Sequence, residues 1–300
     1  MKDLPFQTIR DVFRFAVSRF NAAELTYGHG ADNSVDEAAF IVLEGLRLPV
    51  DRLDIFLDAR LTDAELAHIL ALIEARVATR KPAAYLLGAT YLQNVKFFVE
   101  DGTIVPRSFI AELLMGGAVS GEGGLIDEPE GLRNILDLCT GGGSLAVLAA
   151  MVFDNATVDG VDISPQALAL AERNAELHGL GDRIAFIKGD LFAPLGQARY
   201  DLILANPPYV TAAALAAFPP EYAAEPQLAH LGGADGLDMV RRILAGAKKH
   251  LTPKGALLCE VGTGRATLEA AYPQTPFLWL DTEQTSGEVF WLKAKDAPRL

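Results

Sequence analysis

The sequence has few of the residues from which disulfide frameworks and metal centres are built. It contains two cysteines, Cys139 and Cys259, in 300 residues, too few for the framework of a small secreted protein. Its five histidines are scattered and do not have the spacing of metal ligands. We therefore expect no metal site, and we expect both cysteines to be buried as small hydrophobic residues.

Positive charge is also scarce. Lysine and arginine number 26 against 39 aspartates and glutamates, which gives a net charge of −13. Nonspecific nucleic-acid binding needs a basic face, so no stable binding to nucleic acid is expected. An acidic surface would suit a basic protein partner, although acidity that only keeps the chain in solution would give the same composition.

Long apolar runs are missing as well. The sequence shows no stretch of 18 apolar residues and no signal peptide, so we expect no membrane association and a cytoplasmic protein. Half of the residues are nevertheless hydrophobic, which is enough for a sizeable core. The chain length allows a catalytic domain with a smaller partner domain.

The first part of the chain has helical periodicity. Apolar residues recur at helical spacing over residues 9–20 and again over 66–77. Two capping boxes, Ser34 with Glu37 and Thr62 with Glu65, predict the starts of the second and third helices. We expect a helical bundle over residues 1–82, with a role in substrate recognition or, equally, in packing alone.

The pattern then becomes β-like. Residues 85–105 are rich in β-forming side chains, and Asp101-Gly102 is a strong signal for a hairpin turn. We expect a β-hairpin linker over residues 83–107. Arg107 would either bind a substrate carboxylate or pin this hairpin in place, and Ser108 is suited to cap a short helix near residues 110–114.

From residue 108 to 300 buried strands alternate with helices, which predicts an α/β domain with a Rossmann-like parallel sheet. The expected strands cover residues 135–138, 157–162, 184–188, 201–205 and 256–261. Two further strands, at 277–280 and 289–292, are joined too briefly for a crossover helix. They should therefore form an antiparallel hairpin at the end of the domain.

The fourth strand runs directly into Asn206-Pro207-Pro208-Tyr209. Two prolines make this loop stiff, and the carboxyl ends of strands in open α/β sheets are where ligands bind. The Asn206 side-chain oxygen and the Pro207 carbonyl can each accept one N–H of a planar NH₂ group, and Tyr209 can stack on its flat face. The plainer alternative is a proline-rich turn with a buried tyrosine.

The first strand runs into a glycine loop, Thr140-Gly141-Gly142-Gly143, which precedes a helix. Such a loop lets a cofactor approach the helix N–H groups closely. With Asp162 about 20 residues further on, it satisfies a relaxed dinucleotide fingerprint, so a nicotinamide and S-adenosylmethionine both remain candidates.

Two more carboxylates favour S-adenosylmethionine as the cofactor. Asp137 lies inside the first strand, where it can hold a cationic amino group, and Asp190 at the end of the third strand can accept a hydrogen bond from an adenine amino group. The terminal antiparallel hairpin also differs from a standard dinucleotide fold.

Several stretches carry a family resemblance. ILDLCTGGG, VDISP, GDLF and NPPYV together resemble the class I S-adenosylmethionine-dependent methyltransferases, and their order resembles the glutamine N5-methyltransferase branch. YGHGADNSVDEA, AYLLG, VPRS, EYAAEP, ADGLDMVRRIL and CEVG look like the bacterial ribosomal-protein type within that HemK/PrmB branch. The release-factor type usually has Ile-Pro-Arg-Pro where this chain has Val-Pro-Arg-Ser.

The resemblance covers nearly the whole chain and implies roles for individual residues. Thr140, Gly141, Gly142 and Gly143 would hold the methionine moiety, Asp162 the ribose, and Asp190 with Leu191 would border the adenine. Asn206, Pro207, Pro208 and Tyr209 would hold the glutamine side chain, with Asn206 also next to the cofactor. Some relatives have a large aromatic residue at the position of Leu191.

The implied activity is methylation of a glutamine amide nitrogen in the third protein of the large ribosomal subunit, a basic partner. The alternatives are a release-factor glutamine methyltransferase, an N6-adenine methyltransferase of nucleic acid, and a non-catalytic ribosome-assembly factor that retains a cofactor pocket. The sequence leaves the oligomeric state open.

Overall fold

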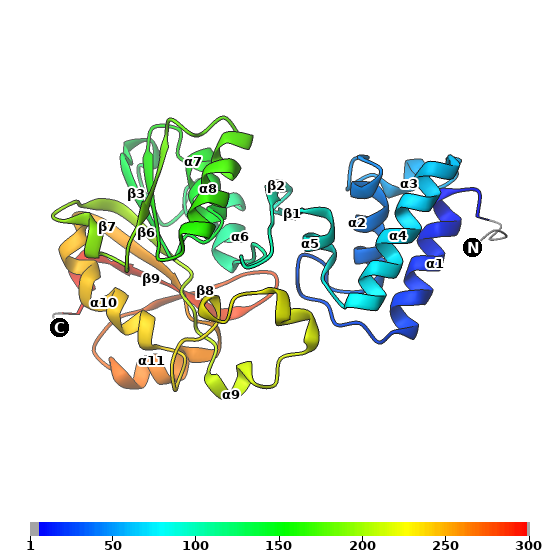
Figure 1. Cartoon of the computed structure of the whole chain (residues 1–300). Coiled ribbons are helices and arrows are strands. Elements are labelled where there is room, and N and C mark those ends of the chain that lie inside the picture. The colour runs from blue at the N-terminus through cyan, green and yellow to red at the C-terminus, as the bar shows by residue number, and fades with distance from the viewer. Residues whose placement is uncertain (1–5, 299–300) are drawn as a thin grey trace. The chain divides into compact units, whose positions relative to one another are not determined.

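The computed structural model describes residues 6–298 (Figure 1), and these fall into two compact units. The helical unit comprises residues 6–91, 99–101 and 218–224, and the α/β unit comprises residues 92–98, 102–217 and 225–298. The ends of the expected segments 1–82 and 108–300, at residues 1–5 and 299–300, lie outside the described residues.

Helices make up most of the first unit. They are α1 (Ile9–Ala22), α2 (Ser34–Gly45), α3 (Leu53–Phe56), α4 (Asp63–Thr79) and α5 (Ala83–Leu87). The stripe predicted on α1 is confirmed, since Val12, Ala16 and Phe20 are fully buried against a cluster that includes residues of α2 and α4. Burial of one apolar stripe per helix is what stabilises such a bundle.

One of the two predicted capping boxes forms and the other does not. Thr62 and Glu65 cap each other at the start of α4, as predicted. At α2 the prediction is wrong: Asn33 is the N-cap, and its Oδ1 accepts hydrogen bonds from the backbone of Val35 and Asp36. Glu37 turns into the interior instead, because the guanidinium of Arg76 is buried there and needs a counter-charge.

The linker contains a hairpin, but its turn is not the predicted one. β1 (Ala89–Leu92) and β2 (Val95–Phe98) form a two-stranded sheet. The turn is Gln93-Asn94, where both residues have positive φ, +51° and +62°. Two consecutive left-handed residues give the turn whose twist matches a hairpin. Asp101-Gly102 makes a later bend outside the hairpin.

The α/β unit is built on a seven-stranded sheet of order β5-β4-β3-β6-β7-β9-β8. Its strands are β3 (Asn134–Leu138), β4 (Thr157–Asp162), β5 (Ile184–Lys188), β6 (Tyr200–Ala205), β7 (Leu251–Glu260), β8 (Leu278–Asp281) and β9 (Ser286–Lys293). β3 to β7 are parallel to their neighbours, and β9 is antiparallel to both β7 and β8. The predicted class I methyltransferase fold and its terminal antiparallel hairpin are confirmed.

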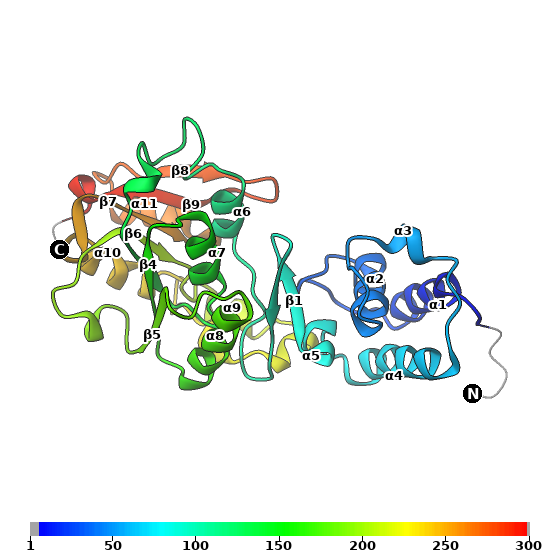
Figure 2. The ribbon, with the colours of Figure 1, turned by 90° about the horizontal axis from the view of Figure 1, so that it is seen from above.

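Helices cover both faces of this sheet (Figure 2). They are α6 (Phe109–Met115), α7 (Ser144–Val152), α8 (Pro165–Leu177), the short α9 (Ala212–Leu215), α10 (Asp238–His250) and α11 (Arg265–Ala271). Alternate residues of β6 enter different cores: Leu202 and Leu204 pack with α6 and α7, while Ile203 and Ala205 pack with α10 and α11. A strand buried on both sides reads as a continuous apolar run, which explains why sequence alone located β6.

Short 3₁₀ helices complete the described structure. They are η1 (Pro129–Gly131), η2 (Ala193–Leu195), η3 (Pro220–Ala224), η4 (Gln227–Ala229), η5 (Gly262–Gly264) and η6 (Ala294–Asp296). None of the helices within residues 6–298 has both the length and the hydrophobicity of a membrane span.

Candidate active site

The candidate site lies in the α/β unit, at the carboxyl ends of β3, β4, β5 and β6. Because these strands are parallel, their carboxyl ends share one edge of the sheet. The chain moves from β3 outward to β5, then returns to β6 on the other side of β3. The predicted cofactor and substrate residues therefore meet at the point where the strand order reverses.

The glycine loop has the geometry that its sequence predicts. Gly141 and Gly143 have left-handed φ values of +54° and +80°. A side chain at Gly143 would place its Cβ 2.9 Å from the Cβ of Ala171, so the close approach of α7 to α8 requires glycine. Two backbone hydrogen bonds hold the turn: the Thr140 N–H donates to the Val161 carbonyl, and the Gly143 N–H donates to the Thr140 carbonyl.

Asp137, in the strand before the loop, is unusual because its carboxylate is buried and only one of its two oxygens has hydrogen-bond partners. It is 1% exposed. Its Oδ2 accepts from the Thr140 hydroxyl at 2.6 Å and from the Ala146 N–H at 3.1 Å. Its Oδ1 is buried with no hydrogen-bond partner among the described residues, and burial raises the pKa of Asp137 to about 7.

An unpaired buried carboxylate oxygen is costly unless a donor or a cation reaches it. The amino group of a methionine moiety supplies both, so the glycine loop and Asp137 fit S-adenosylmethionine.

Asp162 ties the loop to the next strand. Its Oδ2 accepts from the Gly141 N–H at 2.9 Å and its Oδ1 accepts from the Ser164 N–H at 2.8 Å. Ser164 itself caps α8 through the Ala167 N–H, so Asp162 is not needed as the helix cap. Each Asp162 oxygen retains a lone pair that can accept a ribose hydroxyl.

Asp190 and Leu191 follow β5. Asp190 is about half exposed and forms an ion pair with Arg242 at 2.7 Å. Leu191 is 6% exposed, and its side chain belongs to the core on the α10 face. Its φ of +49° is left-handed, as is that of Cys139 at +59°. Strained non-glycine residues thus lie at the ends of both β3 and β5, where strain is characteristic of functional sites.

Asn206 is held in one orientation. Its Nδ2 donates to the backbone carbonyl oxygen of Arg107 at 3.1 Å. A carbonyl can only accept, so the amide nitrogen must face it and the Oδ1 faces the other way. Asn206 therefore presents a hydrogen-bond acceptor, which is the role its sequence position predicts.

Tyr209 is held as firmly. Its hydroxyl donates to Glu260 Oε1 at 2.8 Å, and burial together with the Glu260 carboxylate raises the pKa of Tyr209 well above 10. Gly262, with φ +51°, packs against the ring, since a Cβ there would lie 2.7 Å from it. Tyr209 is consequently a neutral phenol with a fixed ring.

Comparison with known proteins places this site in a family. The methyltransferase small domain matches residues 126–218. The ribosomal protein uL3 glutamine methyltransferase of Bradyrhizobium diazoefficiens is 55% identical, over 96% of this chain and 91% of the relative. Those of Burkholderia pseudomallei and Neisseria gonorrhoeae are 48% and 50% identical, over 98% and 95% of this chain and 97% and 94% of the relatives.

The chain belongs to the ribosomal protein uL3 glutamine methyltransferases. This family depends on S-adenosylmethionine. The predicted family resemblance is confirmed across nearly the whole chain. No group of three or more His, Cys, Asp or Glu side chains in residues 6–298 is arranged to hold a metal ion.

In this member of the uL3 glutamine methyltransferases, glycines enclose the back of the Pro207-Pro208 loop. A Cβ at Gly232 would lie 2.7 Å from the Pro208 carbonyl oxygen, and one at Gly236 would collide with the Tyr209 carbonyl. Val210 also exchanges backbone hydrogen bonds with His230 and Gly232, both at 2.8 Å. Residues 232–236 thus pack on the Asn206–Tyr209 segment.

Three buried polar residues support the site through contacts that were not predicted from the sequence. Asn174 donates to the Gly142 carbonyl at 2.8 Å and so braces the glycine loop. Glu260 binds Tyr209, and Glu225 binds Arg107 in two hydrogen bonds of 2.9 and 2.7 Å. A glutamate directly after the buried run Leu257–Cys259 was the one signal that pointed to Glu260.

Proposed function

We propose that this chain transfers a methyl group from S-adenosylmethionine to the side-chain amide nitrogen, N5, of a glutamine in ribosomal protein uL3. The names of its relatives support the substrate. The orientation of Asn206 carries the chemistry: with its Nδ2 on the Arg107 carbonyl, its Oδ1 is left to accept an N–H from a planar amide. Ser108, in place of the proline usual in the release-factor type, favours uL3 over a release factor.

The cofactor residues follow the site geometry. Thr140, Gly141, Gly142 and Gly143 would hold the methionine moiety, with Asp137 on its amino group. Asp162 would accept from the ribose, and Asp190 with Leu191 would border the adenine. When bound, S-adenosylmethionine supplies an electrophilic methyl group on a cationic sulfur.

The substrate amide nitrogen is a weak nucleophile because its lone pair is delocalised into the carbonyl. Asn206 Oδ1 and the Pro207 carbonyl would accept its two N–H groups and so fix the plane of the amide. Tyr209 would stack on the flat face, with its ring fixed by Glu260 and Gly262. The contribution of the protein is positioning by preorganised acceptors.

No side chain has to act as a strong base before transfer. The raised pKa of Tyr209 keeps it protonated, and its proton is already donated to Glu260. Once alkylated, the amide nitrogen carries an acidic proton that solvent can remove. A neutral, acceptor-lined loop is therefore sufficient for this reaction.

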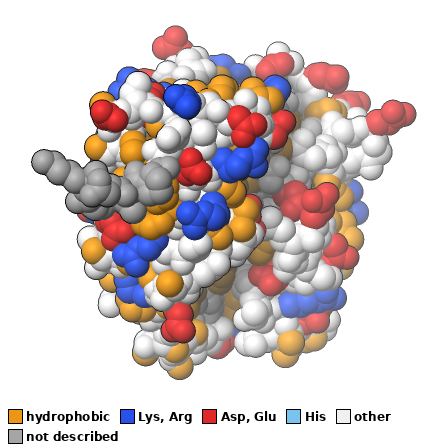
Figure 3. Space-filling view, turned by 90° about the vertical axis from the view of Figure 1, so that its right-hand side faces the viewer, with side chains coloured by type: hydrophobic (Ala, Val, Ile, Leu, Met, Phe, Trp, Pro, Cys, Tyr) orange, Lys and Arg blue, Asp and Glu red, His pale blue; other side chains and the backbone are white. Residues whose placement is uncertain are grey.

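We propose the helical residues 1–82 for substrate recognition and residues 83–107 as the linker to the catalytic domain, 108–300. On the face drawn in Figure 3, acidic and basic side chains are interspersed with hydrophobic ones. Such a mixed surface suits a protein partner better than a nucleic acid. Because ribosomal proteins are made in the cytoplasm, the chain would act there.

The test is a mass spectrum of purified uL3 after incubation with this enzyme and S-adenosylmethionine, with a release factor in parallel. One added methyl group on a glutamine of uL3, and none on the release factor, is the expected result. Methylation of the release factor alone would keep the chemistry and overturn the substrate. No methylation of either, with cofactor binding intact, would overturn the proposed reaction.

A further inference from the structure

We propose that Glu225 is a positioning residue for methyl transfer: it holds the Val105–Arg107 segment so that the Arg107 carbonyl fixes the Asn206 amide. The expected effect on the rate of methyl transfer rests on the proposed function, whereas the expected effect on the orientation of Asn206 does not depend on the substrate. All of these residues belong to the α/β unit.

Glu225 forms hydrogen bonds with both ends of the tripeptide Val105-Pro106-Arg107. Its side chain is fully buried. Its Oε1 accepts from the Val105 N–H at 3.1 Å and from Arg107 Nη1 at 2.9 Å, and its Oε2 accepts from Arg107 Nη2 at 2.7 Å. Its Oε2 also lies 2.9 Å from Nε2 of His230. Pro106 stiffens the backbone between the two points of attachment, so the Arg107 carbonyl has little freedom to turn.

The same short segment also supports Tyr209. The Ser108 hydroxyl and the Phe109 N–H donate to Glu260 Oε2 at 2.7 and 3.0 Å, and the other oxygen of Glu260 accepts from Tyr209. Residues 105–109 therefore connect to Asn206 directly, through the Arg107 carbonyl, and to Tyr209 through the buried Glu260. Glu225 anchors Arg107, whose carbonyl binds the side chain of Asn206.

The orientation of Asn206 decides whether the site accepts or repels its substrate. With Nδ2 on the Arg107 carbonyl, Oδ1 faces an incoming N–H. If the carbonyl moved away, the amide could rotate and present its own N–H groups to those of the glutamine, donor against donor. Loss of Glu225 should therefore lower the rate of transfer and leave cofactor affinity unchanged.

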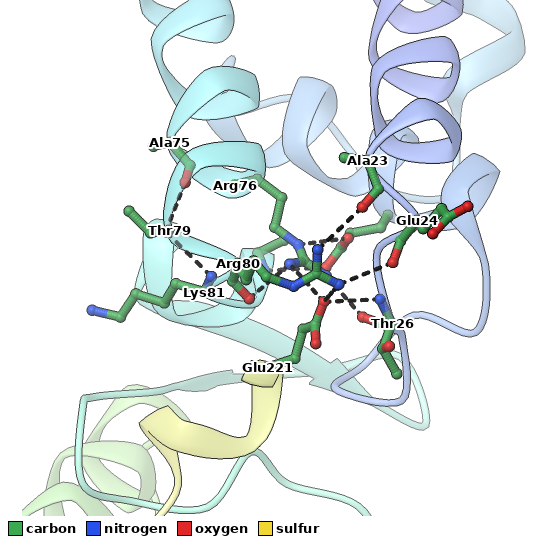
Figure 4. Close-up of polar contacts among 11 residues, drawn as sticks. Ala23, Glu24, Thr26, Ala75, Arg76, Thr79, Arg80, Lys81 and Glu221 are labelled. Carbon is green, nitrogen blue, oxygen red and sulfur yellow. Dashed lines mark hydrogen bonds and ion pairs between the residues drawn. The ribbon is translucent and has the colours of Figure 1, made fainter. Parts of the chain in front are cut away.

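Glu221 is a matched control for Glu225. It lies four residues earlier in the same stretch of chain and is 1% exposed. Its partners belong to the helical unit: it accepts from the Thr26 N–H at 2.9 Å and pairs with Arg80 at 2.6 Å (Figure 4). Glu221→Gln removes the same charge from the same stretch while the bonds from Glu225 to Arg107 stay in place.

The first measurement is single-turnover methylation of uL3 by wild type, Glu225→Gln and Glu221→Gln. We expect Glu225→Gln to slow transfer about 10- to 100-fold, with S-adenosylhomocysteine affinity within about twofold of wild type, and Glu221→Gln to slow it by less than threefold. In an Asn206→Ala background Glu225→Gln should add no further loss. Equal losses for the two glutamates, or a further loss in that background, would overturn the proposal.

The second measurement does not use the substrate. The Asn206 side-chain NH₂ signals of ¹⁵N-labelled protein, assigned by their loss in Asn206→Ala, should shift and exchange faster with water in Glu225→Gln but not in Glu221→Gln. Unchanged signals in Glu225→Gln would refute the positioning role whether or not uL3 is the substrate. If Glu225→Gln does not fold, Arg107→Lys, which cannot form the two-pronged contact, should give the same shift.

Discussion

The side-chain nitrogen of Asn206 lies 3.1 Å from the backbone carbonyl oxygen of Arg107, a residue 99 positions earlier in the chain. This hydrogen bond fixes the orientation of the Asn206 amide, so that its Oδ1 is left to act as a hydrogen-bond acceptor. The orientation of Asn206 therefore depends on the backbone of a segment far away in the sequence.

Replacing Asn206 by aspartate should make activity depend on pH. When ionised, an aspartate oxygen would face the Arg107 carbonyl and repel it. When protonated, its O–H can donate to that carbonyl and its other oxygen can face the substrate. The facing carbonyl raises the pKa of this carboxyl above its usual value of about 3.9, so activity of Asn206→Asp relative to wild type should fall as pH rises from about 4 to 7.

The measurement is single-turnover transfer across that range, with Asn206→Ala as the reference that does not titrate. Asn206→Ala should lose about 100-fold or more in rate at every pH while S-adenosylhomocysteine still binds. An Asn206→Asp rate that rose with pH relative to wild type would contradict the assigned orientation.

Asp137 should make cofactor affinity pH-dependent. Burial raises its pKa to about 7 in the protein alone, and a cationic amino group binds the ionised carboxylate. The affinity for S-adenosylhomocysteine should be fully present above about pH 7 and should fall by up to about tenfold per pH unit below it, because a proton must then be released on binding.

Calorimetric titration between pH 5.5 and 7.5 measures this dependence, and Asp137→Asn supplies the comparison. That variant should bind more weakly at pH 7.5 and with a much flatter pH profile. A wild-type profile as flat as that of Asp137→Asn would rule out Asp137 as the partner of the amino group.

Asp162 and Ser164 should separate cofactor binding from helix capping. Asp162→Ala removes the acceptor of the Gly141 N–H together with the proposed ribose ligand, so cofactor affinity should fall at least about tenfold, the equivalent of one charged hydrogen bond. Ser164→Ala removes the cap of α8 and should lower the free energy of unfolding by about 1 kcal/mol with affinity unchanged. Unchanged affinity in Asp162→Ala would exclude its role in binding.

Much of the fold was predictable because its signals are local. β6 is an apolar run that is followed by a pair of prolines, and α8 has the local signals of a helix, with Ser164 as its N-cap and Pro165 in its first turn. Parallel strands then bring their carboxyl ends together without further information. That rule alone placed Asp137, Asp162 and Asn206 at one edge of the sheet.

The capping-box error occurred where a distant residue decides the outcome. Glu37 has the spacing of a capping residue, but Arg76, 39 positions later, draws it into the interior. Glu225 and Glu260 act on residues 118 and 152 positions away, Arg107 and Ser108. One sequence contains no record of such pairs, so the contacts that these two glutamates make with Arg107 and Ser108 could not be predicted from it.

The close packing of Gly262 on the Tyr209 ring gives the last prediction. Gly262→Ala would place a methyl carbon 2.7 Å from the ring, at a residue with φ of +51°. Gly179→Ala imposes a similar backbone strain at φ +67° with no atom within 4 Å of the added carbon. Both should lower the free energy of unfolding by about 1–2 kcal/mol from strain alone.

Only Gly262→Ala should also displace the ring and slow methyl transfer, by about tenfold or more, with cofactor affinity retained. The measurements are the thermal unfolding and the single-turnover methylation rate of both variants. If the two variants were equally destabilised and had equal rates, the position of the Tyr209 ring would not limit the reaction.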